Sequence, residues 1–170
     1  MTSPPWTPET RLLWQRISNH PLQGDQRLDF LKRLCREQRW TTAYGSQVIE
    51  EYKRFVFLSC VTSSSLTPSI DIDETWHLHL TYTEDYWLTF CPQVLERPLH
   101  HRPTTGSAAD GQKFREQYAQ TLQIYFAWFG PPDRVIWPSS KQRFDRPARM
   151  QRINRDQFWI VRKPWIRNSI

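Results

Sequence analysis

Apolar residues recur every three or four positions along most of this chain, the spacing of amphipathic helices. Thr7 followed by Pro8 predicts a helix start, because a threonine side chain caps the first turn and proline suits its first position. A Ser-rich segment at residues 62–69 predicts a break. Three helices are expected before it, over residues 8 to about 18, residues 24 or 25 to about 38, and residues 42 to about 61.

A fourth helix is expected to begin at Asp71, because Glu74 follows it at the spacing of a capping box. It is expected to end near Cys91, since Pro92 disfavours helical geometry in the residue before it. Residues 92–108 are then predicted to form a proline-bounded loop.

A fifth helix is expected over about residues 109 to 128, where aromatic residues form a regular stripe, with Gly130 and two prolines ending it. The sequence therefore predicts an all-α fold, a compact bundle of about five helices. Ile136 and Trp137 are expected to pack on this bundle. We expect one helical domain over residues 1–138 and a basic, partly extended C-terminal extension over residues 139–170, packed on the domain or trailing from it.

The charge is concentrated in that extension. Residues 141–170 carry 9 Lys and Arg against 2 Asp and Glu, although the whole chain has a net charge of only +6. Cations with interleaved aromatic residues can contact nucleic-acid phosphates, an anionic membrane surface or an acidic protein. No base-reading motif is present, so a solvated or salt-bridged surface is the simpler interpretation. We expect a protein partner, with nucleic acid as a second option.

Composition favours a soluble cytoplasmic protein. The three cysteines are far apart and odd in number, which argues against a disulfide framework. The first residues have neither the basic nor the apolar part of a signal peptide. No apolar run is long enough to span a bilayer. The sequence does not indicate an oligomeric state.

Four of the five histidines lie within 25 positions, between His77 and His101. Asp73 and His77 are four residues apart and would share one face of a helix, whereas His79 lies about 200° from His77. Either the helix is distorted, or one histidine is a ligand and the other is structural. His100 and His101 lie on the following loop, which can fold back. The predicted metal ligands are His77 and His101 first, then His79, Asp73 and His100.

Imidazole and carboxylate ligands suit a divalent transition metal, with zinc expected first and iron or copper as alternatives. Asp73 and Glu84 are the candidates for orienting water or moving a proton. Cys91 is an optional thiolate ligand, although a buried cysteine more often serves as a small apolar residue. The simpler interpretation is that Asp71 and Asp73 stabilise the helix start and that His77 bonds to Asp73.

A short motif gives these residues a family context. Its members are an Asp-x-x-Trp-His-x-His helix with a following Tyr and Cys, here Asp73, Trp76, His77, His79, Tyr86 and Cys91. In this motif the chain resembles the glycine-rich-domain-containing protein family, best known from plants and with many bacterial members. Blocks at residues 33–40 and 129–138 resemble the bacterial branch, so the resemblance covers roughly residues 27–138. It implies an α-helical domain organised around the Trp-His-x-His helix. The glycine-rich region that names the family is absent here, as is the membrane segment of some bacterial relatives.

Two functions follow from these observations. The first is a metal-dependent enzyme that acts on a peptide or small molecule through the His/Asp site. The second is a non-catalytic protein-interaction module, in which the histidines form a structural cluster and the Arg-rich extension binds the partner. An open coordination position would favour the first function, and a closed site or a dry histidine–carboxylate network the second.

Overall fold

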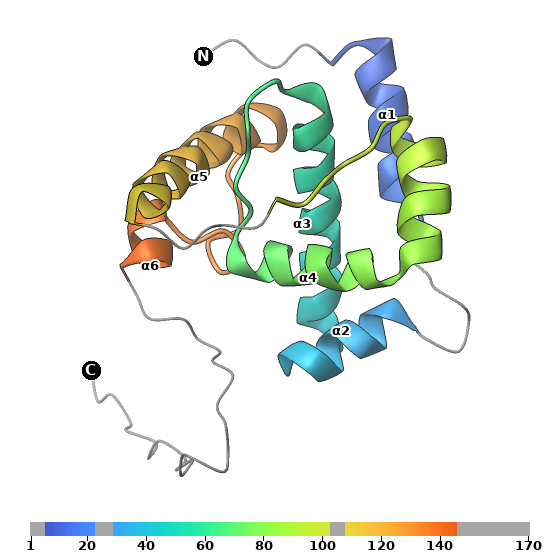
Figure 1. Cartoon of the computed structure of the whole chain (residues 1–170), viewed down its shortest axis with the longest axis horizontal. Helices are drawn as coiled ribbons and strands as arrows, with labels where there is room; N and C mark the ends of the chain where they lie inside the picture. The colour runs from blue at the N-terminus through green and yellow to red at the C-terminus, as the bar shows by residue number, and fades with distance from the viewer. Residues whose placement is uncertain (1–5, 23–28, 103–107, 146–170) are drawn as a thin grey trace.

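The computed structural model describes residues 6–22, 29–102 and 108–145 (Figure 1). Within these ranges the chain forms helices and no strand, so the all-α prediction is confirmed. Seven helices are described, two more than the roughly five expected. They are α1 (Pro8–Asn19), α2 (Phe30–Gln38), α3 (Thr42–Val61), α4 (Ile70–Thr81), the π-helix η1 (Asp85–Leu95), α5 (Ala108–Phe129) and α6 (Ser140–Phe144).

The predicted helix signals hold at α1, α3 and α5. Thr7 and Thr10 cap α1 reciprocally, each side chain accepting from the other's backbone N–H, and Pro8 occupies the first turn. α3 has the predicted bounds, with Thr41 as its cap. α5 is one residue longer than predicted at each end and stops before Gly130, whose φ of 81° few other residues tolerate.

The predicted start of α2 was too early. Asp29 has non-helical backbone angles, and its side chain accepts a hydrogen bond from the Lys32 backbone N–H at 3.1 Å. An aspartate in this position satisfies one of the unpaired N–H groups of a first turn. The helix therefore begins at Phe30, and residues 23–28 lie outside the described ranges.

The predicted fourth helix is in fact two helices. α4 begins at Ile70 because Ser69, rather than Asp71, caps it by accepting from the Ile72 backbone N–H. It ends at Thr81, well before the predicted end near Cys91. η1 then runs through Pro92 to Leu95, so the proline lies inside a helix and the following loop is shorter than predicted. The wider turn of a π-helix gives the proline ring room that an α-helix lacks.

α3 forms the centre of the bundle, with α1, α2, α4 and α5 packed around it (Figure 1). η1 turns sharply away from α4 and packs against α1, where Arg16 donates to the Val94 carbonyl at 3.0 Å. Burial of each large apolar side chain contributes about 1.5–3 kcal/mol. The buried apolar side chains of α3 are those of Val48, Tyr52, Phe55, Val56, Phe57 and Leu58.

A buried carboxylate fixes α5 and the segment after it onto α3. Glu51 is 6% exposed and accepts hydrogen bonds from the Tyr125 hydroxyl at 2.6 Å and the Trp137 indole N–H at 2.9 Å. Arg54, one turn along α3, forms an ion pair with Glu51 at 2.6 Å. Ile136 and Trp137 are fully buried, which confirms that they pack on the bundle.

α6 was not predicted, because the positions around it were assigned to an extended tail. Its cap is a reciprocal pair of hydrogen bonds between Ser139 and Gln142. It packs on α5, where the Arg115 guanidinium forms an ion pair with Asp145 at 2.6 Å. Residues 146–170 lie outside the described ranges, so the predictions for the rest of the Arg-rich extension stay predictions. In the sequence, arginines recur every third residue from Arg143 to Arg155, and Arg143 is the one of these that lies in the described ranges.

Candidate metal centre

α4 presents two different faces. Ile72, Trp76 and His79 are buried against the bundle, whereas Asp73 and His77 lie on the outward side. Because these two are four residues apart, they stand one above the other on the same helix face. His77 is exposed and the Asp73 side chain is 32% exposed, so both side chains are accessible to a solute.

The third member of the site comes from the loop after η1. Tyr86 of η1 accepts a hydrogen bond from the Trp76 indole N–H at 2.9 Å and donates to the Leu99 carbonyl at 2.5 Å. This bridge ties the loop to α4 two residues before His101. The His101 ring then packs edge-on against Trp76, with ring centroids 4.6 Å apart. The loop therefore folds back toward α4, as the sequence suggested.

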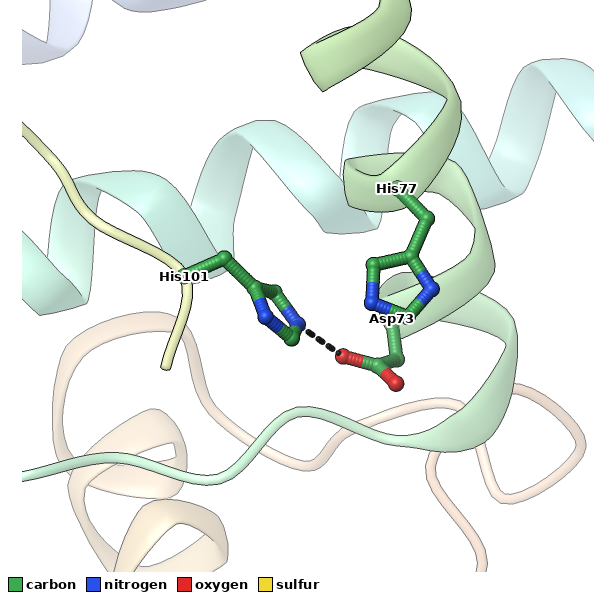
Figure 2. Close-up of side chains that lie close together, drawn as sticks. All are labelled: Asp73, His77 and His101. Atoms are coloured by element: carbon green, nitrogen blue, oxygen red, sulfur yellow. Dashed lines mark hydrogen bonds and ion pairs between the residues drawn. The ribbon is translucent and has the colours of Figure 1, made fainter. Parts of the chain in front are cut away.

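Asp73, His77 and His101 converge in Figure 2, the first two from α4 and the third from the returning loop. His101 Nε2 and Asp73 Oδ1 are 2.8 Å apart, and the rings of His77 and His101 have centroids 4.4 Å apart. One ligand atom from each of the three residues can be chosen so that all lie within 4.8 Å of one another. Two imidazoles and a carboxylate thus meet at one point on the surface.

This donor set fits a divalent transition metal. Zinc is held by His nitrogen and carboxylate oxygen at about 2.0–2.2 Å, which places tetrahedral ligand atoms about 3.4 Å apart. To reach that spacing, Asp73 Oδ1 and His101 Nε2 would move apart from 2.8 Å, and ligand atoms separated by up to 4.8 Å would move closer, for which the exposed His77 side chain has room. Three protein ligands leave at least one coordination position for water or substrate. Iron and copper accept the same ligand types.

Two of the predicted ligands lie outside this group. His79 is fully buried on the opposite side of α4, which favours the alternative that one histidine of the pair is structural. His100 is exposed and packs against Trp87 of η1, with ring centroids 5.6 Å apart. We therefore leave His79 and His100 out of the proposed ligand set.

The other sequence candidates also lie elsewhere. Glu84 is exposed in the turn between α4 and η1, because the helix that would have aligned it with His77 ends at Thr81. Cys91 is buried, and burial raises the pKa of its thiol, which fits the small apolar role. Tyr82, one turn after His79 in the sequence, is buried against Phe30 and belongs to the core.

A second histidine cluster lies in the interior, and sequence reasoning missed it. Asp85, at the start of η1, is 2.9 Å from His79 Nε2 and 3.0 Å from His20 Nε2. An ionised carboxylate accepts only, so both ring nitrogens donate to it, and the Tyr52 hydroxyl donates to His79 Nδ1 at 2.8 Å. His20 is the one histidine of the chain outside residues 77–101, and no local sequence pattern links position 20 to position 85.

The electrostatics of this interior cluster suit a structural role. Burial alone would raise the pKa of Asp85, but hydrogen bonds and charge from His20 and His79 outweigh it and lower that pKa to about 2. Burial lowers the pKa of His79, although Asp85 opposes the shift. The cluster therefore holds an ionised carboxylate between α1, α3 and α4, and every polar atom named has a partner.

Comparisons with models of known protein families, with curated proteins and with solved structures found no match for this chain. The resemblance to the glycine-rich-domain-containing protein family therefore stays a prediction from the motif. Among the described residues, no helix is long and apolar enough to cross a membrane.

Proposed function

We propose that this chain binds one divalent transition metal ion, zinc being the first choice, through Asp73, His77 and His101. The observation that carries the proposal is the convergence of three ligand atoms within 4.8 Å from two separate parts of the chain. A helix start uses carboxylates commonly, but it does not need two imidazoles brought to the same carboxylate. The anchored loop supplies the second imidazole.

An open coordination position supports a further step, a metal-dependent enzyme. A metal held this way supplies Lewis-acid or activated-water chemistry at neutral pH. The outward position of the site, with His77 exposed, is accessible to a peptide or small-molecule substrate. In this proposal Asp73 and the two histidines hold the ion, and Glu84 has no catalytic role because it lies on the turn beyond α4.

A non-catalytic module is the second candidate, and one contact favours it. His101 and Asp73 already hydrogen-bond each other at 2.8 Å, which ties the loop to α4 without an ion. In that case the surface cluster would be structural, as the interior cluster is.

Elemental analysis of the purified full chain, after zinc loading and removal of excess metal, tests the proposal. We expect about one zinc per chain, retained by His100→Ala and lost from a His77→Ala, His101→Ala variant that keeps its helical circular dichroism. His100→Ala is a matched control, because it removes an exposed imidazole from the same loop. We expect the zinc affinity of His77→Ala alone to fall at least about 100-fold. Mutating residues that only hydrogen-bond to metal ligands already lowers metal affinity by about 10- to 100-fold.

Each contrary result has a distinct meaning. A parent that retains no metal after loading with zinc, iron or copper contradicts the metal site and leaves the interaction module. Equal zinc content in the double variant and the parent contradicts the ligand assignment.

A further inference from the structure

Tyr86 of η1 is buried, and its hydroxyl both accepts and donates a hydrogen bond. It accepts from the Trp76 indole N–H at 2.9 Å and donates to the Leu99 carbonyl at 2.5 Å. A phenylalanine could make neither bond, because both depend on the phenolic O–H. Burial raises the pKa of Tyr86 well above its ordinary value, so at neutral pH the hydroxyl keeps the proton that it donates to Leu99.

The Leu99 carbonyl belongs to the loop of residues 96–102, which form neither helix nor strand. No regular ladder of backbone hydrogen bonds fixes such a segment, so contacts from side chains decide where it lies. His101 follows Leu99 by two residues, which span at most about 7 Å of chain. The bond from Tyr86 to Leu99 therefore limits how far His101 can move from α4.

The contacts of His101 continue this path to the proposed ligands. Its ring packs edge-on against Trp76, with ring centroids 4.6 Å apart, and its Nε2 atom is 2.8 Å from Asp73 Oδ1. Trp76 thus contacts His101 with its ring and bonds to Tyr86 with its N–H. An unbroken chain of contacts connects the Tyr86 hydroxyl to two of the three proposed metal ligands.

The Tyr86 ring is itself held by the interior histidine cluster. The His79 ring lies edge-on to it, with ring centroids 4.9 Å apart. Asp85, the residue before Tyr86, hydrogen-bonds to both His79 and His20. Tyr86 therefore contacts the buried histidine of α4 with its ring and fixes the loop that carries His101 with its hydroxyl.

We propose that Tyr86 is a positioning residue of the metal centre, whose hydroxyl holds the loop so that His101 stays in place to bind the ion. The proposal rests on the proposed metal site and adds to it a residue that controls its affinity. Groups that orient metal ligands without touching the ion typically change metal affinity by about 10- to 100-fold when mutated. A loop that is already in place also loses less conformational freedom when the ion binds.

Cobalt titration of the full chain, followed by the visible absorption of bound Co²⁺, measures the affinity of the centre. We expect Tyr86→Phe to keep its helical circular dichroism and to bind Co²⁺ about 10- to 100-fold more weakly than the parent. Tyr118→Phe is the matched control, because Tyr118 is also fully buried and its hydroxyl also donates to a backbone carbonyl, that of Pro138, at 2.7 Å. This control loses a comparable hydrogen bond on α5 and should bind Co²⁺ as the parent does.

Two variant backgrounds separate the positioning of His101 from a general loss of stability. In a His101→Ala background the Tyr86 hydroxyl has no imidazole left to position, so Tyr86→Phe should weaken Co²⁺ binding further by no more than about twofold. In a His77→Ala background, which keeps His101, the full weakening should persist. If Tyr86→Phe does not fold, Trp76→Phe takes its place in the same comparison, because it removes the indole N–H that bonds to the hydroxyl.

The outcomes separate the two proposals. A parent that binds no Co²⁺ contradicts the metal site itself. Equal Co²⁺ affinity in the parent and the folded Tyr86→Phe variant overturns the positioning role and leaves the metal site in place. An equal loss of affinity in Tyr118→Phe, or an undiminished effect of Tyr86→Phe in the His101→Ala background, overturns it as well.

Discussion

Glu51→Ala is expected to lower the free energy of unfolding by about 3–5 kcal/mol, because two buried donors lose their acceptor at a cost of about 1–3 kcal/mol each. The Tyr125 hydroxyl and the Trp137 indole N–H both donate to Glu51, and both side chains are almost fully buried. Without the carboxylate these donors lose their acceptor in a place that water does not reach easily. Arg54, 36% exposed, can rehydrate. Urea denaturation followed by circular dichroism measures the change.

Glu50→Ala provides the control for this prediction. Glu50 precedes Glu51 on α3, but its side chain is 56% exposed and its one described ion pair, to Lys53, is long at 3.5 Å. We expect a change within about 0.5 kcal/mol. If Glu50→Ala and Glu51→Ala destabilise the protein equally, the buried carboxylate does not hold α5 and Trp137 onto α3.

Asp85→Ala is expected to lower the free energy of unfolding by about 2–4 kcal/mol. It removes the shared acceptor of His20 and His79, whose side chains are 9% and 0% exposed. Each buried donor left unpaired costs about 1–3 kcal/mol. Glu84→Ala is the control, because Glu84 is the adjacent carboxylate, is exposed and makes no side-chain cap to η1. It should leave the stability within about 0.5 kcal/mol of the parent.

The pH dependence of stability gives Asp85 a second signature. Its pKa is lowered in the folded state from 3.8 to about 2, so the unfolded chain binds this proton more readily. The resulting stabilisation, about 2 kcal/mol, is complete above about pH 5 and is lost as the pH falls toward 2. Urea unfolding at pH 5 and at pH 2.5 should therefore show a smaller acid-induced loss in Asp85→Ala than in Glu84→Ala. Equal losses in the two variants would show that Asp85 is not the linked group.

Local sequence signals were enough to predict the bounds of helices whose ends are set by capping residues and helix breakers nearby in the sequence. The Thr7–Pro8 start of α1 and the bounds of α3 depend on caps and breakers within a few positions, and they were predicted correctly. The boundary between α4 and η1 was not, because it depends on a distant contact. Asp85 bonds to His20, the residue after the end of α1 and 65 positions away, and no local pattern encodes that pairing. Pro92 misled the prediction because a π-helix accommodates a proline that an α-helix does not.

The sequence likewise predicted one part of the candidate site and not the rest. The spacing of Asp73 and His77 on one helix face is a local property, so it could be read from the sequence. The return of His101 depends on the Tyr86 bridge between Trp76 and Leu99, and it was foreseen only as something that the loop could do. His79 and His77 faced opposite ways as helix geometry required, but their different roles became clear from the interior cluster.

The most direct test of the metal site is anomalous diffraction at the zinc absorption edge from crystals of the zinc-loaded full chain. We expect a peak about 2.0–2.2 Å from an oxygen of Asp73 and from one ring nitrogen each of His77 and His101. No peak between these residues, with the Asp73–His101 hydrogen bond intact and zinc bound elsewhere or not at all, would contradict it.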